Sequence, residues 1–278
     1  PFNLFQQVEK YKTTWINATP TYYAIIVKSK ILAEDHDLSS LKFVRTSSSP
    51  LPRTIQEQFE YTYKVPMVDS LGMSETAGQL FVNGRRSRKK GSVGKEVLIE
   101  SQIRDNVGNC LNVHQEGEIW VKCEGLMPGY LDDEDATNKV IRGGWFDTGD
   151  LGYFDEDGFL FLKGRKKEIA IVGGKNVSLK EVDEVFYAHP KVINAVSIAV
   201  EDEISSNKIV SFVIIDQNSG ENVGIELQEF FQNTLASYKC PKEIYHVEDF
   251  PLGGGGKILR NKVKEYYING DYHGKQIN

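Results

Sequence analysis

The sequence predicts an α/β protein that continues into an α+β domain, and three changes of pattern along the chain support this fold class. Residues 1–90 alternate strand-like and helix-like runs, and residues 91–163 alternate apolar and polar positions as half-buried strands do. Residues 164–278 then begin a new series of strands and helices. With 278 residues, 40% of them hydrophobic, the chain is long and apolar enough for about two domains.

The first stretch follows the order strand, loop, helix, strand, loop. We expect a strand at "KFVRT" (42–46), a helix at 53–63 and a strand at "VPMVD" (65–69). In "SLGMSETAG", which follows, Ser74 and Glu75 are expected to begin a further helix. A helix N-terminus favours phosphate and a carboxylate there can hold Mg²⁺, although simple capping by Ser74 explains the pattern equally well.

The middle stretch is expected to be a small antiparallel β unit. "GEIWVK" (117–122) alternates sides, and two apolar-rich runs flank the turn 155–158, which predicts a hairpin. The acidic turn does not fit a calcium loop, because Tyr153 and Gly164 occupy positions that need oxygen ligands.

The last stretch begins with a strand at "EIAIV" (168–172) and a turn at "GGKN". Ser178 and Glu181 have the spacing of a capping box, which predicts a helix that buries Val182, Val185 and Phe186. Strand-like runs follow at 192–200 and 209–215, and the second predicted helix carries Ile225, Leu227, Phe230, Phe231 and Leu235. The short polar link 164–167 is the expected boundary before this domain.

Composition excludes several classes of protein. A net charge of −6 argues against nucleic-acid binding, and no apolar run approaches the ~20 residues of a membrane helix. Cys110, Cys123 and Cys240 are too scattered for a zinc site or a disulfide framework, which favours reduced thiols in the cytoplasm. We interpret the basic run 85–90 as a solvated loop or a docking point for a phosphate-bearing ligand.

Two segments contain residues suited to nucleotide chemistry. Asp150 stands in the turn Thr-Gly-Asp-Leu-Gly, and Arg165 follows fifteen residues later. A carboxylate can accept both hydroxyls of a ribose and an arginine can bind phosphate, although a surface hairpin with an ordinary ion pair is the alternative. The Gly-rich run before Lys257 does not fit a phosphate loop, because Ile258 stands where Ser or Thr is required; a flexible turn is its alternative explanation.

Taken together, seven segments resemble motifs of the adenylate-forming superfamily, which includes acyl-CoA synthetases, firefly-type luciferases and the adenylation domains of peptide synthetases. They occur in the family's order, and they read "TSSSPLP", "SLGMSE", "GSVGK", "GWFDTGDLG", "LKGRKKE", "GGKNVSLKEVD" and "PLGGGGKILR". The resemblance implies that 1–163 is the remainder of a large AMP-binding α/β domain ending in a small β-barrel-like unit at about 91–163. Residues 164–278 would be a mobile C-terminal α+β domain.

The resemblance also assigns roles to single residues. The adenine side of the nucleotide site would consist of Ser48, Ser49, Pro50, Leu71 and Gly72. Ser74 would contact phosphate, Glu75 would bind Mg²⁺, and Asp150 would hold the ribose hydroxyls beside Arg165.

In the small domain, the resemblance implies one pivot and two faces. Lys167 would be the hinge, Gly173 and Gly174 would approach the thiol acceptor, and Lys257 would be the catalytic lysine of adenylate formation. The position of Leu71 usually holds Tyr and that of Leu179 usually holds Pro, so the chain departs from the family at both.

The activity implied by the resemblance is that of an ATP-dependent carboxylate–CoA ligase. Such an enzyme forms an acyl-adenylate with release of pyrophosphate, and then an acyl-CoA thioester. ATP, Mg²⁺, CoA and a carboxylic acid, with fatty acid metabolism as the context, are the expected cofactors and partners. "GGKNVS" favours CoA as acceptor. The alternatives are an enzyme that loads a carrier protein and a non-catalytic interaction module.

One family motif, the Ser/Thr/Gly-rich phosphate loop with its lysine, does not occur in these 278 residues. We therefore expect this chain to need an N-terminal subdomain as a partner and to be inactive by itself. Tyr22, Tyr23 and Gly78 are possible contacts of the carboxylic acid, although packing is the simpler explanation for the two tyrosines.

Overall fold

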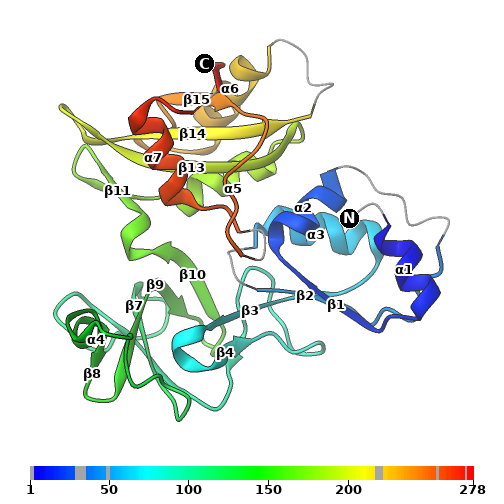
Figure 1. Ribbon diagram of the computed structural model, residues 1–278, viewed down its shortest axis with the longest axis vertical. Coiled ribbons are helices and arrows are strands. Elements are labelled where there is room, and N and C mark those ends of the chain that lie inside the picture. Colours follow the sequence, from blue (N-terminus) through cyan, green and yellow to red (C-terminus); the bar gives the residue numbers. More distant parts are fainter. Residues whose placement is uncertain (1–2, 29–35, 48–50, 217–221, 255–256, 273) are drawn as a thin grey trace.

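Three β-sheets follow one another along the part of the chain that the computed structural model describes (Figure 1). The described residues are 3–28, 36–47, 51–216, 222–254, 257–272 and 274–278. Within them, no helix is long and apolar enough to cross a membrane.

The first sheet has a parallel half and an antiparallel half. Its strands, in spatial order, are β1 (Trp15–Ala18), β2 (Phe43–Thr46), β3 (Met67–Met73), β4 (Gly78–Val82) and β5 (Lys95–Glu96). The helices of this region are α1 (Leu4–Tyr11), α2 (Pro20–Lys28) and α3 (Arg53–Tyr63). In α3, Ile55, Phe59 and Tyr63 recur every four residues and are buried, so one stripe of the helix enters the core that contains Val44 and Met67.

The second sheet is the predicted antiparallel β unit. Its strands are β6 (Glu100–Arg104), β7 (Gly117–Lys122), β8 (Ile141–Arg142), β9 (Trp145–Phe154) and β10 (Leu160–Arg165). The expected hairpin joins β9 to β10. A helix that we did not predict, α4 (Glu134–Val140), interrupts the unit; Asp133 begins it, because its carboxylate accepts a hydrogen bond from the Ala136 N–H.

The third sheet has a hydrophobic core on each face of its strands β13 and β14. Its strands are β11 (Ile169–Val172), β12 (Lys175–Ser178), β13 (Val192–Asp202), β14 (Ser206–Ile215), β15 (Glu243–His246) and β16 (Lys275–Gln276). The helices are α5 (Leu179–Ala188), α6 (Val223–Thr234) and α7 (Arg260–Asn269). Ala195 of β13 belongs to the core that includes α5 and α6, whereas its neighbour Val196 belongs to the core that includes Val263 of α7. This explains why residues 192–200 of β13 are apolar on both faces apart from Asn194 and Ser197.

The predicted fold class is confirmed, and the expected elements recur with three local corrections. The helix expected at Ser74 is a single 3₁₀ turn (η1, Ser74–Thr76), and its N-cap position is Met73 rather than Ser74. Ala77 has φ +56°, so the chain reverses there and pairs β4 with β3 instead of continuing a helix.

The second correction concerns α5. The helix begins where the capping-box spacing predicts and buries Val182, Val185 and Phe186, but the Ser178 side chain does not cap it. The Ser178 hydroxyl instead donates to the Lys163 carbonyl, 2.7 Å away.

The third correction concerns the link between the second and third sheets. Gly164 and Arg165 still belong to β10, and the connection to β11 is the 3₁₀ turn η2 (Lys166–Glu168). The division of the chain at residue 164 stays a prediction.

Candidate active site

A cavity of about 170 Å³ lies where the three sheets approach one another. Five residues that the motifs singled out line it together: Leu71 and Gly72 in β3, Asp150 in β9, Arg165 in β10, and Lys257 ahead of α7. These residues come from four segments spread over almost 190 positions, so the fold brings five of the predicted site residues together in one place.

Asp150 is the most strongly perturbed of these groups. Its side chain is 7% exposed, and Oδ1 lies 3.1 Å from Nε of Arg165. Its other oxygen, Oδ2, is buried and has no hydrogen-bond partner among the described residues. Burial raises the pKa of Asp150 to about 6, against the attraction of Arg165 and Lys257, while Glu168 raises it further. The site therefore contains a buried acceptor that is free for a ligand donor.

The hairpin that joins β9 to β10 positions Asp150 next to Arg165. Asp150 stands directly opposite Arg165 near the end of the antiparallel ladder, because a bulge between Leu162 and Gly164 shifts the register by one residue. Thr148 fixes the local backbone, because its hydroxyl donates to the Ile119 carbonyl and accepts from the Asp150 N–H at 3.1 Å. The fifteen-residue spacing is thus a consequence of hairpin geometry.

Lys257 lies at the rim of the cavity on an irregular segment. Its backbone carbonyl accepts from the Gly253 N–H at 2.8 Å, and a β-bridge between Leu252 and Ile258 encloses the turn. Three residues later, Arg260 begins α7 and pairs with Asp183 of α5 at 2.7 Å. The exposed ammonium of Lys257 is therefore carried by an anchored loop.

Other predicted residues lie apart from the cavity lining. Ser74 is exposed, and Glu75 accepts a hydrogen bond from the Tyr130 hydroxyl at 3.2 Å. Gly173 and Gly174 form the exposed turn between β11 and β12, with φ +57° and +75°. Lys167 lies in η2, as a residue of the link. Ser48, Ser49 and Pro50 lie outside the described residues.

The two tyrosines behave as packing residues. Tyr23 is fully buried and Tyr22 packs against the same core. Neither they nor Gly78 line the cavity.

Several lining residues were not predicted from the sequence. They are charged groups: Asp69 inside β3, Lys180 and Asp183 in α5, and Arg260. Burial raises the pKa of Asp69 to about 7. Asp69 stands two residues before Leu71 in a predicted strand, and this spacing could have suggested that both line the same site. Nothing in the sequence pattern pointed to the α5 residues as part of the site.

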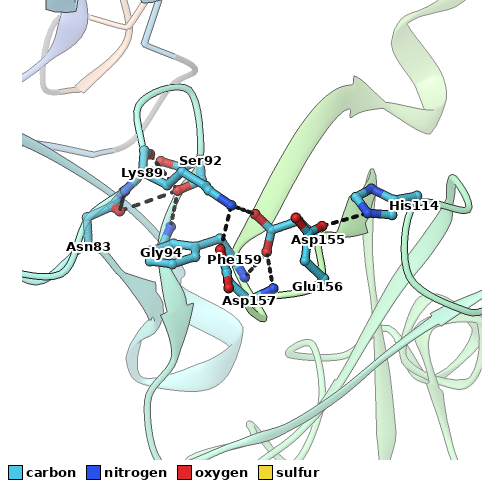
Figure 2. Close-up of polar contacts among 9 residues, drawn as sticks. All are labelled: Asn83, Lys89, Ser92, Gly94, His114, Asp155, Glu156, Asp157 and Phe159. Atoms are coloured by element: carbon cyan, nitrogen blue, oxygen red, sulfur yellow. Dashed lines mark hydrogen bonds and ion pairs between the residues drawn. The ribbon is translucent and has the colours of Figure 1, made fainter.

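In the basic run 85–90, Arg88, Lys89 and Lys90 are paired with neighbouring acids, whereas Arg85 and Arg86 are exposed. Lys89 Nζ pairs with Asp155 and Asp157 in the β9–β10 turn, as Figure 2 shows. Arg88 and Lys90 both pair with Glu60 of α3. The loop thus joins the first and second sheets.

Glu75 is the metal ligand that the sequence predicts. Within the described residues, no group of three or more His, Cys, Asp or Glu could hold a metal ion. Mg²⁺ commonly binds through one or two carboxylates together with substrate phosphates, so a single carboxylate at this position is compatible with it.

Comparison with known proteins agrees with this arrangement. The AMP-binding enzyme family matches residues 1–131, and the AMP-binding enzyme C-terminal domain matches 181–257. The oxalate–CoA ligase of Arabidopsis thaliana is 32% identical over 94% of this chain and 51% of its own length. The long-chain-fatty-acid–CoA ligase of Bacillus subtilis is 32% identical over 95% of this chain and 48% of its own.

Solved structures extend the comparison to the fold. An anthranilate–CoA ligase in complex with anthranoyl-AMP has a TM-score of 0.87 at 27% identity, over 95% of this chain and 51% of that one. An amide bond synthetase from Marinactinospora thermotolerans has a TM-score of 0.84 at 26% identity, over 95% and 54%. The chain thus spans about half the length of the curated relatives it matches.

Proposed function

This chain belongs to the adenylate-forming family of AMP-binding enzymes, and we propose that it is the C-terminal half of an ATP-dependent carboxylate–CoA ligase. The observation that carries the proposal is the cavity that Leu71, Asp150, Arg165 and Lys257 line together. The CoA ligases among its relatives support the choice of reaction. Free thiols at Cys110, Cys123 and Cys240 support a cytoplasmic location.

In the first step, the substrate carboxylate attacks the α-phosphate of ATP and pyrophosphate leaves. Asp150 Oδ2, which has no hydrogen-bond partner in the described part of the chain, accepts the ribose hydroxyls, and Arg165 lies beside it to bind ribose oxygen or phosphate. The Lys257 ammonium at the rim offsets the negative charge that grows on the phosphate. The protein thus contributes position and charge rather than a covalent intermediate.

Glu75 is the residue that would hold Mg²⁺, which neutralises phosphate charge when bound. Its Oε1 accepts from the Tyr130 hydroxyl, which orients the carboxylate. Ser74, the exposed neighbour of Glu75, would contact phosphate.

In the second step, the thiol of CoA attacks the carbonyl carbon of the acyl-adenylate, AMP leaves, and the thiol proton passes to solvent. Gly173 and Gly174 would approach this acceptor after the third sheet turns about Lys167. Lys257 lines the cavity whereas the glycine turn does not, so the arrangement described here fits the first step.

The experiment has two stages. Calorimetry with AMP tests the site in the 278-residue chain, which we expect to bind AMP but not to catalyse pyrophosphate exchange. Fusion to a segment that carries a phosphate loop should restore exchange with an acid from a panel of oxalate, 2-succinylbenzoate and long-chain fatty acids. Absence of AMP binding would favour the non-catalytic alternative.

The acceptor is decided in the same preparation. Acylation of free CoA is the expected result. Acylation of a carrier protein would favour the second candidate, and amide formation with an added amine would place this protein nearer to the amide bond synthetase relative.

A further inference from the structure

The C-terminal end of α5 is held by a lysine from the opposite side of the cavity. Lys28, the last residue of α2, donates from Nζ to the carbonyls of Tyr187 and His189, each at 3.2 Å. These residues are about 160 positions apart in the chain. The contact therefore joins the first sheet's helices to the third sheet, and α2 and α3 lie next to the third sheet and α5 in Figure 1.

The chemistry of this contact suits a docking point. The last carbonyls of a helix lack partners within the helix and carry its negative partial charge, so an ammonium there is favourable. Burial lowers the pKa of Lys28, which indicates that its ammonium has lost water in reaching these carbonyls. Both acceptors are backbone carbonyl oxygens, which any residue at positions 187 and 189 would supply. The contact therefore depends on the side chain at position 28.

Further contacts dock the same helix to the other sheets. The Tyr187 side chain packs against the core of the first sheet. At the N-terminal end, Lys180 Nζ donates to the Leu162 carbonyl of β10 at 2.7 Å, and Ser178 donates to Lys163. Helix α5 is thus anchored at both ends to parts of the chain that precede the link.

The same helix also sets the position of Lys257. Asp183, in the middle of α5, pairs with Arg260, and Arg260 also lies 3.4 Å from Glu168 in η2. Because Lys257 precedes Arg260 by three residues, a shift of α5 moves the loop that carries the ammonium.

We propose that Lys28 is a positioning residue, which docks α5 and thereby holds Lys257 over the cavity. The effect of this docking on catalysis rests on the proposed function, since the arrangement with α5 docked is the one that fits adenylate formation. A turn about Lys167 requires both Lys28 hydrogen bonds to break, so Lys28 also sets how readily the third sheet leaves that position.

The test compares Lys28→Met with Lys28→Arg in the 278-residue chain. Lys10→Met is the matched control, because Lys10 is exposed on α1 and is in no ion pair that the structure describes. Small-angle scattering measures the radius of gyration, and mass spectrometry follows trypsin cleavage at Lys166 and Lys167 in the link.

We expect Lys28→Met to enlarge the radius of gyration and to speed cleavage in the link by about three- to tenfold, as loss of charge-assisted hydrogen bonds implies. Lys28→Arg should restore both values, and Lys10→Met should leave them unchanged. Equal behaviour of Lys28→Met and Lys10→Met would overturn the proposal, and so would failure of arginine to rescue.

Circular dichroism separates domain opening from unfolding. Should Lys28→Met unfold, Lys28→Gln, which keeps a polar side chain but removes the charge and shortens its reach to the two carbonyls, must produce the opening, or the proposal fails. Calorimetry with AMP on wild type is independent of these readouts. Opening without any AMP binding would leave the docking role standing and refute the proposed function.

Discussion

Asp150→Asn should raise the free energy of unfolding of the ligand-free protein and lower its affinity for AMP. The pKa of Asp150 is raised from 3.8 to about 6, so folding disfavours the ionised carboxylate. A difference of this size corresponds to about 3 kcal/mol at pH 7, as an upper value. Asparagine resembles the protonated acid, so the variant should gain up to about 3 kcal/mol at neutral pH.

The pH dependence of stability tests the direction of this effect. For a carboxyl whose folded pKa is raised, wild-type stability increases as pH falls from above 6 toward 3.8, because protonation removes the penalty. The advantage of Asp150→Asn should therefore be largest at pH 7.5 and shrink at pH 4.5. Urea unfolding followed by circular dichroism at both values measures the free energy of unfolding.

The same variant should lose AMP affinity by about 1–3 kcal/mol, because ribose hydroxyls then lack a charged acceptor. Calorimetry with AMP and 2′-deoxy-AMP measures this, and the deoxy analogue should lose little further affinity in the variant. A variant that is less stable than wild type at pH 7.5 and binds AMP normally would refute the reasoning, since Asp150 would then serve only its ion pair with Arg165.

The other predictions concern the lysines of the site and of the basic loop. Lys257→Ala, in a fusion that carries a phosphate loop, should lower pyrophosphate exchange about 100-fold but spare thioester formation from supplied acyl-adenylate. Lys167→Pro fixes φ at the pivot and should do the reverse; equal damage to both assays would contradict the two-step arrangement. Lys89→Met leaves the buried Asp155 carboxylate without its ammonium partner and should lower the melting temperature. Lys122→Met, at an exposed ion pair of 3.4 Å, is its control and should change the melting temperature little.

The local sequence pattern was sufficient to predict contacts between residues that a single turn brings together. The acidic turn 155–158 predicts the β9–β10 hairpin, and the hairpin together with its bulge between Leu162 and Gly164 brings Asp150 opposite Arg165. The start of α5 and its buried face followed from spacing for the same reason. Such features need no knowledge of the rest of the fold.

Features that depend on distant contacts were not predictable in the same way. The sequence predicts a helix at Ser74. Gly72 and Gly78 approach so closely, however, that a Cβ on Gly72 would lie 2.4 Å from the Gly78 carbonyl oxygen, and this approach allows β3 to pair with β4 instead. Helix α7 buries only Val263 and therefore has little apolar periodicity to detect. Its existence depends on packing against β13.

The position of Lys257 shows why a motif does not by itself define a site. The glycine run before it leaves the backbone free, so the sequence allows the ammonium to lie almost anywhere near α7. The structure restricts it through Arg260, which pairs with Asp183 in α5, and α5 is in turn docked by Lys28. Each contact joins residues at least 77 positions apart. Under the proposed function, Lys257 is therefore held over the cavity only while α5 is docked, and the strength of that docking sets how easily Lys257 can leave the cavity.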